Sequence, residues 1–303
     1  MTAERPRDVP AVREQLVRSC ATVYASGGEQ GRILTAWELE TLTSDDLRMV
    51  WVSADMLSVV LDAAPTVPDD LSLPELPRFP SGLAMFARPI EALDAWDETR
   101  RVTVEGVLWG PTRVRRGAGK ATGGTAIAAV GRFGDPDPVW VPVGRSEWMD
   151  DEPLSVVDSD RLTPVAPMPA RGGKLPLPTE NTWGAYKASA VEDRVLLAAL
   201  AGLMNEPRVA QVGTWAPHNK STRRRYGNVS VATVTLRSER AAARSGATQG
   251  GRLTHRSYVA PYFRMQPYGP GGGLRRLQMV SGHIRGPEGA PMLKRDTVWS
   301  LVR

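Results

Sequence analysis

The segment between residues 82 and 146 constrains the fold most, because it reads as short strands with no helix between them. The runs are GLAMFARPI, RVTVEGVLWGP, GTAIAAVGRF and PVWVPVGR, which are rich in Val, Ile and aromatic residues and bounded by Gly, Pro or Asp. A doubly wound parallel sheet alternates strands with helices, so this pattern argues against that fold. It predicts an antiparallel sheet or a small barrel over this segment.

The first 65 residues are predicted to be helical. In AVREQLVRSCATVYA, the spacing of four between Val12, Leu16, Cys20 and Tyr24 forms one apolar stripe that ends at SGG. Cys20 lies in this stripe, so we interpret it as a small buried side chain and not as a nucleophile. A second helix is predicted for TSDDLRMVWVSADMLSVVLDAAP, with a cap at the Thr or Ser of TSDD and a stop at Pro65.

The strongest helical pattern in the second half of the chain is YKASAVEDRVLLAALAGLMNEP. The sequence after this segment is strand-like. The strand-like runs are RVAQVG, NVSVATVTLRS, HRSYVAPYFRMQ, LRRLQMVSGHIR and DTVWSLVR. We therefore predict an α+β protein, in which a helical N-terminal segment is followed by mainly antiparallel β domains with one long amphipathic helix. The predicted parts are a helical segment at 1–66, a β-rich middle domain at 67–165 and a basic β-rich domain with a leading helix at 183–303.

Charge is distributed unevenly along the chain. Residues 1–200 contain 21 Lys and Arg against 29 Asp and Glu, whereas residues 201–303 contain 17 against 4. The excess of 33 arginines over 5 lysines is typical of a GC-rich gene, but codon bias would spread arginine evenly. The asymmetry predicts that the last third (residues 201–303) faces an anion, which is nucleic acid, phosphate or the acidic front part of the same protein.

Two stretches of the last third combine basic and aromatic residues. HNKSTRRRYGN is predicted to be a protruding polar turn, if RVAQVG pairs with NVSVATVTLRS. In the hairpin YFRMQPYGPGGGLRRLQ, strand alternation puts Tyr262 and Arg264 on one face and Phe263 and Met265 on the other. Guanidinium groups bind phosphates and aromatic rings stack on bases, so we predict that DNA or RNA binds here. The candidate nucleic-acid-binding residues are Lys220, Arg223, Arg224, Arg225, Tyr226, Tyr262, Arg264, Arg275, Arg276 and Arg285.

Two other functions remain open on the sequence alone. A metal-independent nuclease or toxin-like enzyme needs an acid–base pair beside phosphate-binding arginines, and His255 and His283 are candidates for that pair. Alternatively, the basic third docks on an acidic partner and the protein has a structural or interaction role. The hairpin face also fits an ordinary solvated face of a half-buried sheet. DNA versus RNA, base preference and oligomeric state do not follow from the sequence.

Several cofactor and metal patterns are missing. RRGAGKATGGT lacks the GxxxxGK[ST] arrangement of a phosphate loop, and GPGGGL lacks GxGxxG. The three histidines have no CxxC, HxxxH or HxH partner, and no GxSxG occurs, so we predict neither a metal nor a cofactor. One cysteine excludes an intramolecular disulfide, and no signal-peptide pattern begins the sequence. Because no apolar run is long enough for a membrane helix, we predict a cytoplasmic protein without a membrane partner.

The stretches HRSYVAPYFRMQPYG and RRLQMVSGHIRGPEGAPML resemble the C-terminal part of a family of uncharacterised proteins from actinobacterial genomes, phages and plasmids. PSGLAMFARPI, VLWGP and LLAALAGLMNEP are similar to upstream segments of that family, so the resemblance covers most of the chain. One departure is Tyr262–Phe263–Arg264, where the family pattern has a His–Trp–Arg run. The resemblance implies an accessory protein of a phage or mobile element, and it implies no activity, cofactor or catalytic residue.

Overall fold

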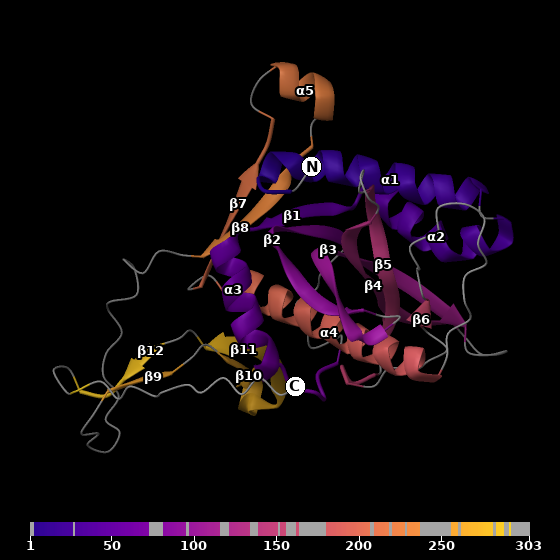
Figure 1. Ribbon diagram of the computed structural model, residues 1–303. Coiled ribbons are helices and arrows are strands. Elements are labelled where there is room, and N and C mark those ends of the chain that lie inside the picture. The colour runs from indigo at the N-terminus through magenta and orange to yellow at the C-terminus, as the bar shows by residue number, and fades with distance from the viewer. Residues whose placement is uncertain are drawn as a thin grey trace.

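An eight-stranded mixed sheet organises the protein, with its strands in the order β6-β5-β4-β3-β2-β1-β8-β7 (Figure 1). In chain order these strands are β1 (Arg48–Val52), β2 (Gly82–Asp94), β3 (Asp97–Arg115), β4 (Ala121–Phe133), β5 (Val139–Met149), β6 (Leu162–Thr163), β7 (Ala210–Trp215) and β8 (Val231–Leu236). The computed structural model describes residues 3–26, 28–72, 81–94, 97–115, 121–133, 139–150, 152–155, 162–163, 180–206, 209–217, 220–227, 229–236, 256–259, 262–280, 283–287 and 291. The helices, the mixed sheet and the two small two-stranded sheets confirm the predicted α+β class.

The middle of the sheet confirms the strands predicted between 82 and 146. β2, β3, β4 and β5 pair in sequence order as antiparallel neighbours. Alternate side chains enter different cores, because Leu83 and Met85 are buried on one face of β2 and Ala84 and Phe86 on the other. The period of two that predicted these strands therefore also determines which layer each side chain joins.

β1 corrects the prediction that residues 1–66 are helical throughout. It lies inside the sheet and pairs in parallel with β2 on one side and β8 on the other. The segment predicted as one helix is therefore a strand followed by α3 (Ala54–Ala63). Ser53 caps α3 in place of the predicted Thr43 or Ser44, because its hydroxyl accepts the backbone N–H of Met56 at 3.3 Å.

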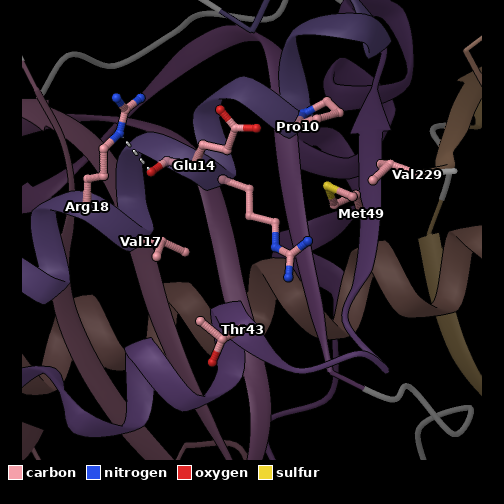
Figure 2. A pocket seen from close by; sticks show the side chains of 8 residues that line it. Pro10, Glu14, Val17, Arg18, Thr43, Met49 and Val229 are labelled. Carbon is pink, nitrogen blue, oxygen red and sulfur yellow. Dashed lines mark hydrogen bonds between the residues drawn. The ribbon is translucent and has the colours of Figure 1, made fainter. Parts of the chain in front are cut away.

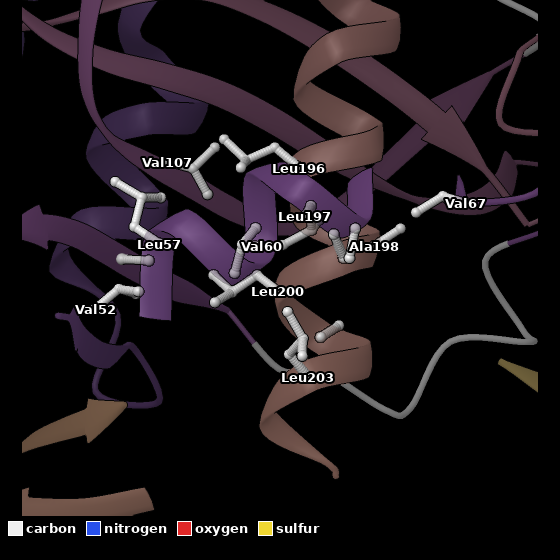
Figure 3. Close-up of a cluster of buried hydrophobic side chains, with 14 of the residues drawn as sticks. Val52, Leu57, Val60, Val67, Val107, Leu196, Leu197, Ala198, Leu200 and Leu203 are labelled. Atoms are coloured by element: carbon white, nitrogen blue, oxygen red, sulfur yellow. The ribbon is translucent and has the colours of Figure 1, made fainter. Parts of the chain in front are cut away.

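Helices cover both faces of the sheet, so the main fold has three layers. α1 (Val9–Ser26) and α2 (Gly28–Thr43) lie on one face, and α3 and α4 (Glu180–Met204) lie on the other (Figure 1). α4 lies where the amphipathic helix was predicted, and residues 196–203 are buried on every side of it. Its leucines at 196, 197, 200 and 203 are buried in the core that it shares with α3, as Figure 3 shows. None of the described helices is both long and apolar enough to cross a membrane.

The stripe predicted for α1 is buried except at its end. Val12, Leu16 and Cys20 are each at most 1% exposed, whereas Tyr24, near the end of the helix, is 39% exposed. Burial, and then the nearby Glu38 carboxylate, raises the pKa of the Cys20 thiol to about 12. A thiol that stays protonated inside the core fits the predicted structural role of Cys20.

The last third of the chain extends the main sheet and also forms two small sheets. Because β7 and β8 lie beside β1, strands from the predicted parts 1–66, 67–165 and 183–303 share one sheet. β10 (Tyr262–Tyr268) and β11 (Leu274–Val280) form the predicted antiparallel hairpin, and β9 (Ser257–Val259) pairs with β12 (His283–Arg285).

The face of the β10–β11 hairpin that packs on α4 follows the predicted alternation. Phe263 is buried and Arg264 is exposed. Phe263 lies so close to Gly202 of α4 that a Cβ atom there would be 2.6 Å from the ring. The hairpin is therefore part of the main core and not a loosely attached element.

Candidate nucleic-acid interface

The predicted basic turn at 218–228 contains a short helix, α5 (Lys220–Tyr226), which projects beyond the sheet (Figure 1). β7 and β8 on either side of it are antiparallel neighbours, so the predicted strand pairing is confirmed and the predicted turn is corrected to a helix. Lys and Arg are good helix formers, which explains a helix in so polar a segment. Gly227, with a left-handed φ of +66°, ends the helix, and its N–H donates to the Arg223 carbonyl at 2.9 Å.

α5 carries positive charge and no carboxylate. Its sequence is KSTRRRY, and the side chains of Lys220, Arg223 and Arg224 are exposed. The Nε–H of Arg223 donates to the Pro217 carbonyl at 3.1 Å, so this guanidinium is tied to the base of the helix. Among the described residues, none of the three cations forms an ion pair. The side chains of Arg225 and Tyr226 lie outside the described part of the structure.

The other predicted binding residues lie at the opposite end of the molecule from α5, on the elements around β10, β11 and β12 (Figure 1). Arg264 and Arg285 are exposed, and Tyr262 is half-buried. Arg275 and Arg276 belong to β11, but their side chains lie outside the described residues. The structure therefore divides the predicted surface into two groups, an α5 group and a β10–β12 group.

Only one of the two histidines of the nuclease alternative lies in the described structure, so their pairing stays a prediction. His283 is exposed on β12, where its backbone lies opposite Val259 of β9. His255 lies outside the described residues. Within the described ranges, no group of three or more His, Cys, Asp or Glu side chains is placed to hold a metal ion. The described residues of this region therefore support no chemical step.

Two ion pairs in the front part (residues 1–200) join acidic and basic residues of that same part. Arg145 donates from Nη1 to both carboxylate oxygens of Glu38, at 2.9 and 3.1 Å, and Arg132 pairs with Glu105. Burial raises the pKa of the Glu38 carboxyl, while the Arg145 guanidinium acts in the opposite direction. These pairs give no support to the interpretation in which the basic third serves to neutralise the acidic front part.

No family model and no curated protein matches this sequence. The function is therefore inferred from the described residues, and the resemblance to an actinobacterial phage family stays a prediction. Of the two basic groups, α5 is the better defined, because three of its cations are placed and exposed and its helix stands clear of the layers around the sheet.

A pocket beside α1 was not predicted. It has a volume of about 550 Å³ and lies between α1, the end of α2, β1 and the residues that lead from α5 into β8. Arg13 and Arg18 line it from α1, and Val229 lines it from the segment before β8 (Figure 2). The apolar stripe in the sequence of α1 predicts only the side of the helix that faces the core, and the pocket lies on another side. No sequence signal indicates that distant segments enclose another side of the helix.

Proposed function

We propose that this protein binds nucleic acid through backbone phosphates, with α5 as the contacting element. The observation that supports this most directly is the exposure of Lys220, Arg223 and Arg224 on a projecting helix that has no acidic residue. Phosphate contacts from Lys and Arg release counterions, and this release provides most of the affinity of sequence-independent binding. The proposal includes the setting of a phage or mobile element, which the sequence resemblance suggests.

The size of α5 fits a surface or groove contact. Seven residues of α-helix are about 10 Å long, and a helix with its side chains is about 10–12 Å across, close to the roughly 12 Å width of the DNA major groove. Phosphate contacts position a protein without reading bases. We therefore expect binding with weak sequence preference, and we expect duplex DNA and structured RNA to compete with each other.

The test removes two charges from α5 and measures the affinity for random DNA and RNA at several salt concentrations. In the double variant Arg223→Gln/Arg224→Gln, the slope of log K against log salt should become shallower by about two units, because about one counterion is released per phosphate contact. Arg264→Gln/Arg285→Gln is the matched control, since it removes the same charge from exposed positions at the other end of the molecule.

An unchanged slope in the α5 variant would remove α5 from the proposal. A shallower slope in the control variant alone would place the interface at the β10–β12 group instead. Wild-type protein that shows no salt-dependent binding, but forms stable assemblies with an acidic partner, would favour the interaction role. Metal-independent cleavage that is lost in His283→Ala would favour the nuclease.

A further inference from the structure

We propose that the pocket beside α1 binds a nucleotide-sized ligand, with its phosphate on the arginine side and its base on the apolar side. The pocket volume of about 550 Å³ lies within the usual range of roughly 300–1,000 Å³ for small-molecule sites. Its chemistry does not depend on α5, so this inference stands or falls independently of the proposed function.

The two ends of the pocket differ in character. Figure 2 shows Met49 and Val229 close together at one end and Arg18 at the other. Met49 is buried with an exposed fraction of 5%, and Val229 beside it is half-buried, so an apolar surface is available for a planar ring. Such a surface would be of no use to a bare inorganic anion, and this favours a phosphate that carries an organic group.

Arg13 is held in place before any ligand binds. Its Nε–H donates to the Leu42 carbonyl at 2.7 Å, which ties the side chain to the end of α2. Among the described residues, its terminal nitrogens make no hydrogen bond, so they are available to an anion. A guanidinium whose orientation is already fixed loses less conformational freedom on binding, and it can form two parallel hydrogen bonds with a phosphate.

Arg18 and Glu14 determine the charge at the rim. The Nε–H of Arg18 donates to the backbone carbonyl of Glu14 at 3.3 Å, as the dashed line in Figure 2 shows. Two arginines and one glutamate line the pocket, so its lining is positive overall. The Glu14 carboxylate repels a phosphate, whereas its backbone carbonyl positions Arg18. These two effects can be separated by substitution.

The phosphate can come from a free nucleotide or from a nucleotide of a strand that α5 holds. Val229 lines the pocket only three residues beyond the end of α5 at Tyr226, so the pocket adjoins the base of the projecting helix. Both sources present the same chemistry, which is a phosphate ester joined to a planar base. Competition between a mononucleotide and a short oligonucleotide distinguishes them.

The experiment is calorimetric titration of the full chain with AMP, adenosine and inorganic phosphate. We expect AMP to bind more tightly than either of the other two probes. Arg13→Gln should weaken AMP binding about tenfold or more, as for the loss of a hydrogen bond to a charged group, and should leave adenosine binding unchanged. Because Arg13 also holds the end of α2, Arg18→Gln at an exposed position is the second variant and should weaken AMP in the same way.

Glu14→Gln is the matched variant, and it should change the AMP affinity in the opposite direction. It removes the repelling carboxylate and keeps the backbone carbonyl that holds Arg18, so AMP should bind more tightly. AMP that binds no better than phosphate, or an AMP affinity that neither Arg18→Gln nor Glu14→Gln changes, would overturn the inference.

A competition experiment identifies the source of the phosphate. If an oligonucleotide displaces AMP, the pocket takes part of a bound strand; if both bind together, it takes a free nucleotide. The Arg223→Gln/Arg224→Gln variant should leave AMP binding unchanged. Failure of the α5 proposal is therefore distinguishable from failure of the pocket proposal.

Discussion

Arginine occupies two different environments in this protein. In the front part, Arg194 is buried and the side chain of Arg145 is only 8% exposed. Each guanidinium lies over a tryptophan ring, at 5.7 Å for Arg145 and 5.8 Å for Arg194. Arg194, whose exposed fraction is 0%, donates to the carbonyls of Leu154 and Glu147. These cations connect segments that are far apart in the sequence, so their role is structural.

In α5, by contrast, Arg223 and Arg224 are exposed and form no ion pair among the described residues. The same side chain therefore stabilises the fold in one region and presents charge to solvent in the other. The difference shows that arginine content alone says little about function, because a guanidinium inside the fold is already held by internal partners. Only exposed cations without a partner can attract a polyanion.

The largest difference in stability between the two regions should appear when an arginine inside the fold is removed. Arg145→Met leaves the Glu38 carboxylate buried without its partner, and such a change costs about 3–5 kcal/mol of unfolding free energy. Arg224→Met, at an exposed position, should change it by less than about 0.5 kcal/mol. Urea denaturation measures both. Similar losses in the two variants would contradict the distinction, and Glu38→Gln combined with Arg145→Met should recover part of the loss.

A smaller effect concerns Asp193, the buried acid next to Arg194 in the chain. Burial, and then the Glu192 carboxylate, raises the pKa of Asp193 from 3.8 to about 8. The folded protein keeps a proton that the unfolded chain has released, so the stability from this group is present below pH 3.8 and is lost as the pH rises through 8. Between pH 5 and 7 we expect a fall on the order of 2 kcal/mol.

Asp193→Asn tests this by removing the proton exchange. In urea titrations at several pH values, its unfolding free energy should depend less on pH than that of the wild type. Asp62→Asn, at an exposed position of α3, should keep the wild-type dependence. Parallel pH profiles for the Asp193 variant and the wild type would show that this carboxyl is ionised inside the core.

The smallest effects should come from single exposed arginines of the β10–β12 group. Arg264→Gln and Arg285→Gln should each change the unfolding free energy by less than about 0.5 kcal/mol, because neither side chain has an ion pair among the described residues. Thermal unfolding of the two variants beside the wild type measures this. A loss above 1 kcal/mol in either would mean that this group resembles the buried arginines more than those of α5.

The strands of the middle sheet could be predicted because their evidence is local. Alternation along GLAMFARPI or RVTVEGVLWGP reports on two faces of one strand, and each strand pairs with its neighbour in the chain. The hairpin of β10 and β11 and the leucines of α4 were predictable for the same reason. In these segments the pattern of apolar residues is sufficient to place side chains in the core.

β1, α5 and the pocket were not predictable in this way. RMVWV follows a capping signal and precedes a true helix, and only its distant partners in β2 and β8 make it a strand. α5 has no apolar stripe, so the period of a helix is invisible in KSTRRRY. The charge asymmetry located basic residues along the chain, but it contained no information on the distance between α5 and the β10–β12 group.

The central position of β1 also determines when the main sheet can form during synthesis. Val50 lies opposite Ala84 of β2 and opposite Ala232 of β8. During synthesis the backbone N–H and C=O groups on one side of β1 therefore have no native partner until the chain beyond residue 231 has emerged. Unpaired apolar strands promote association between chains, so a nascent chain that stalls before β8 should depend on chaperones.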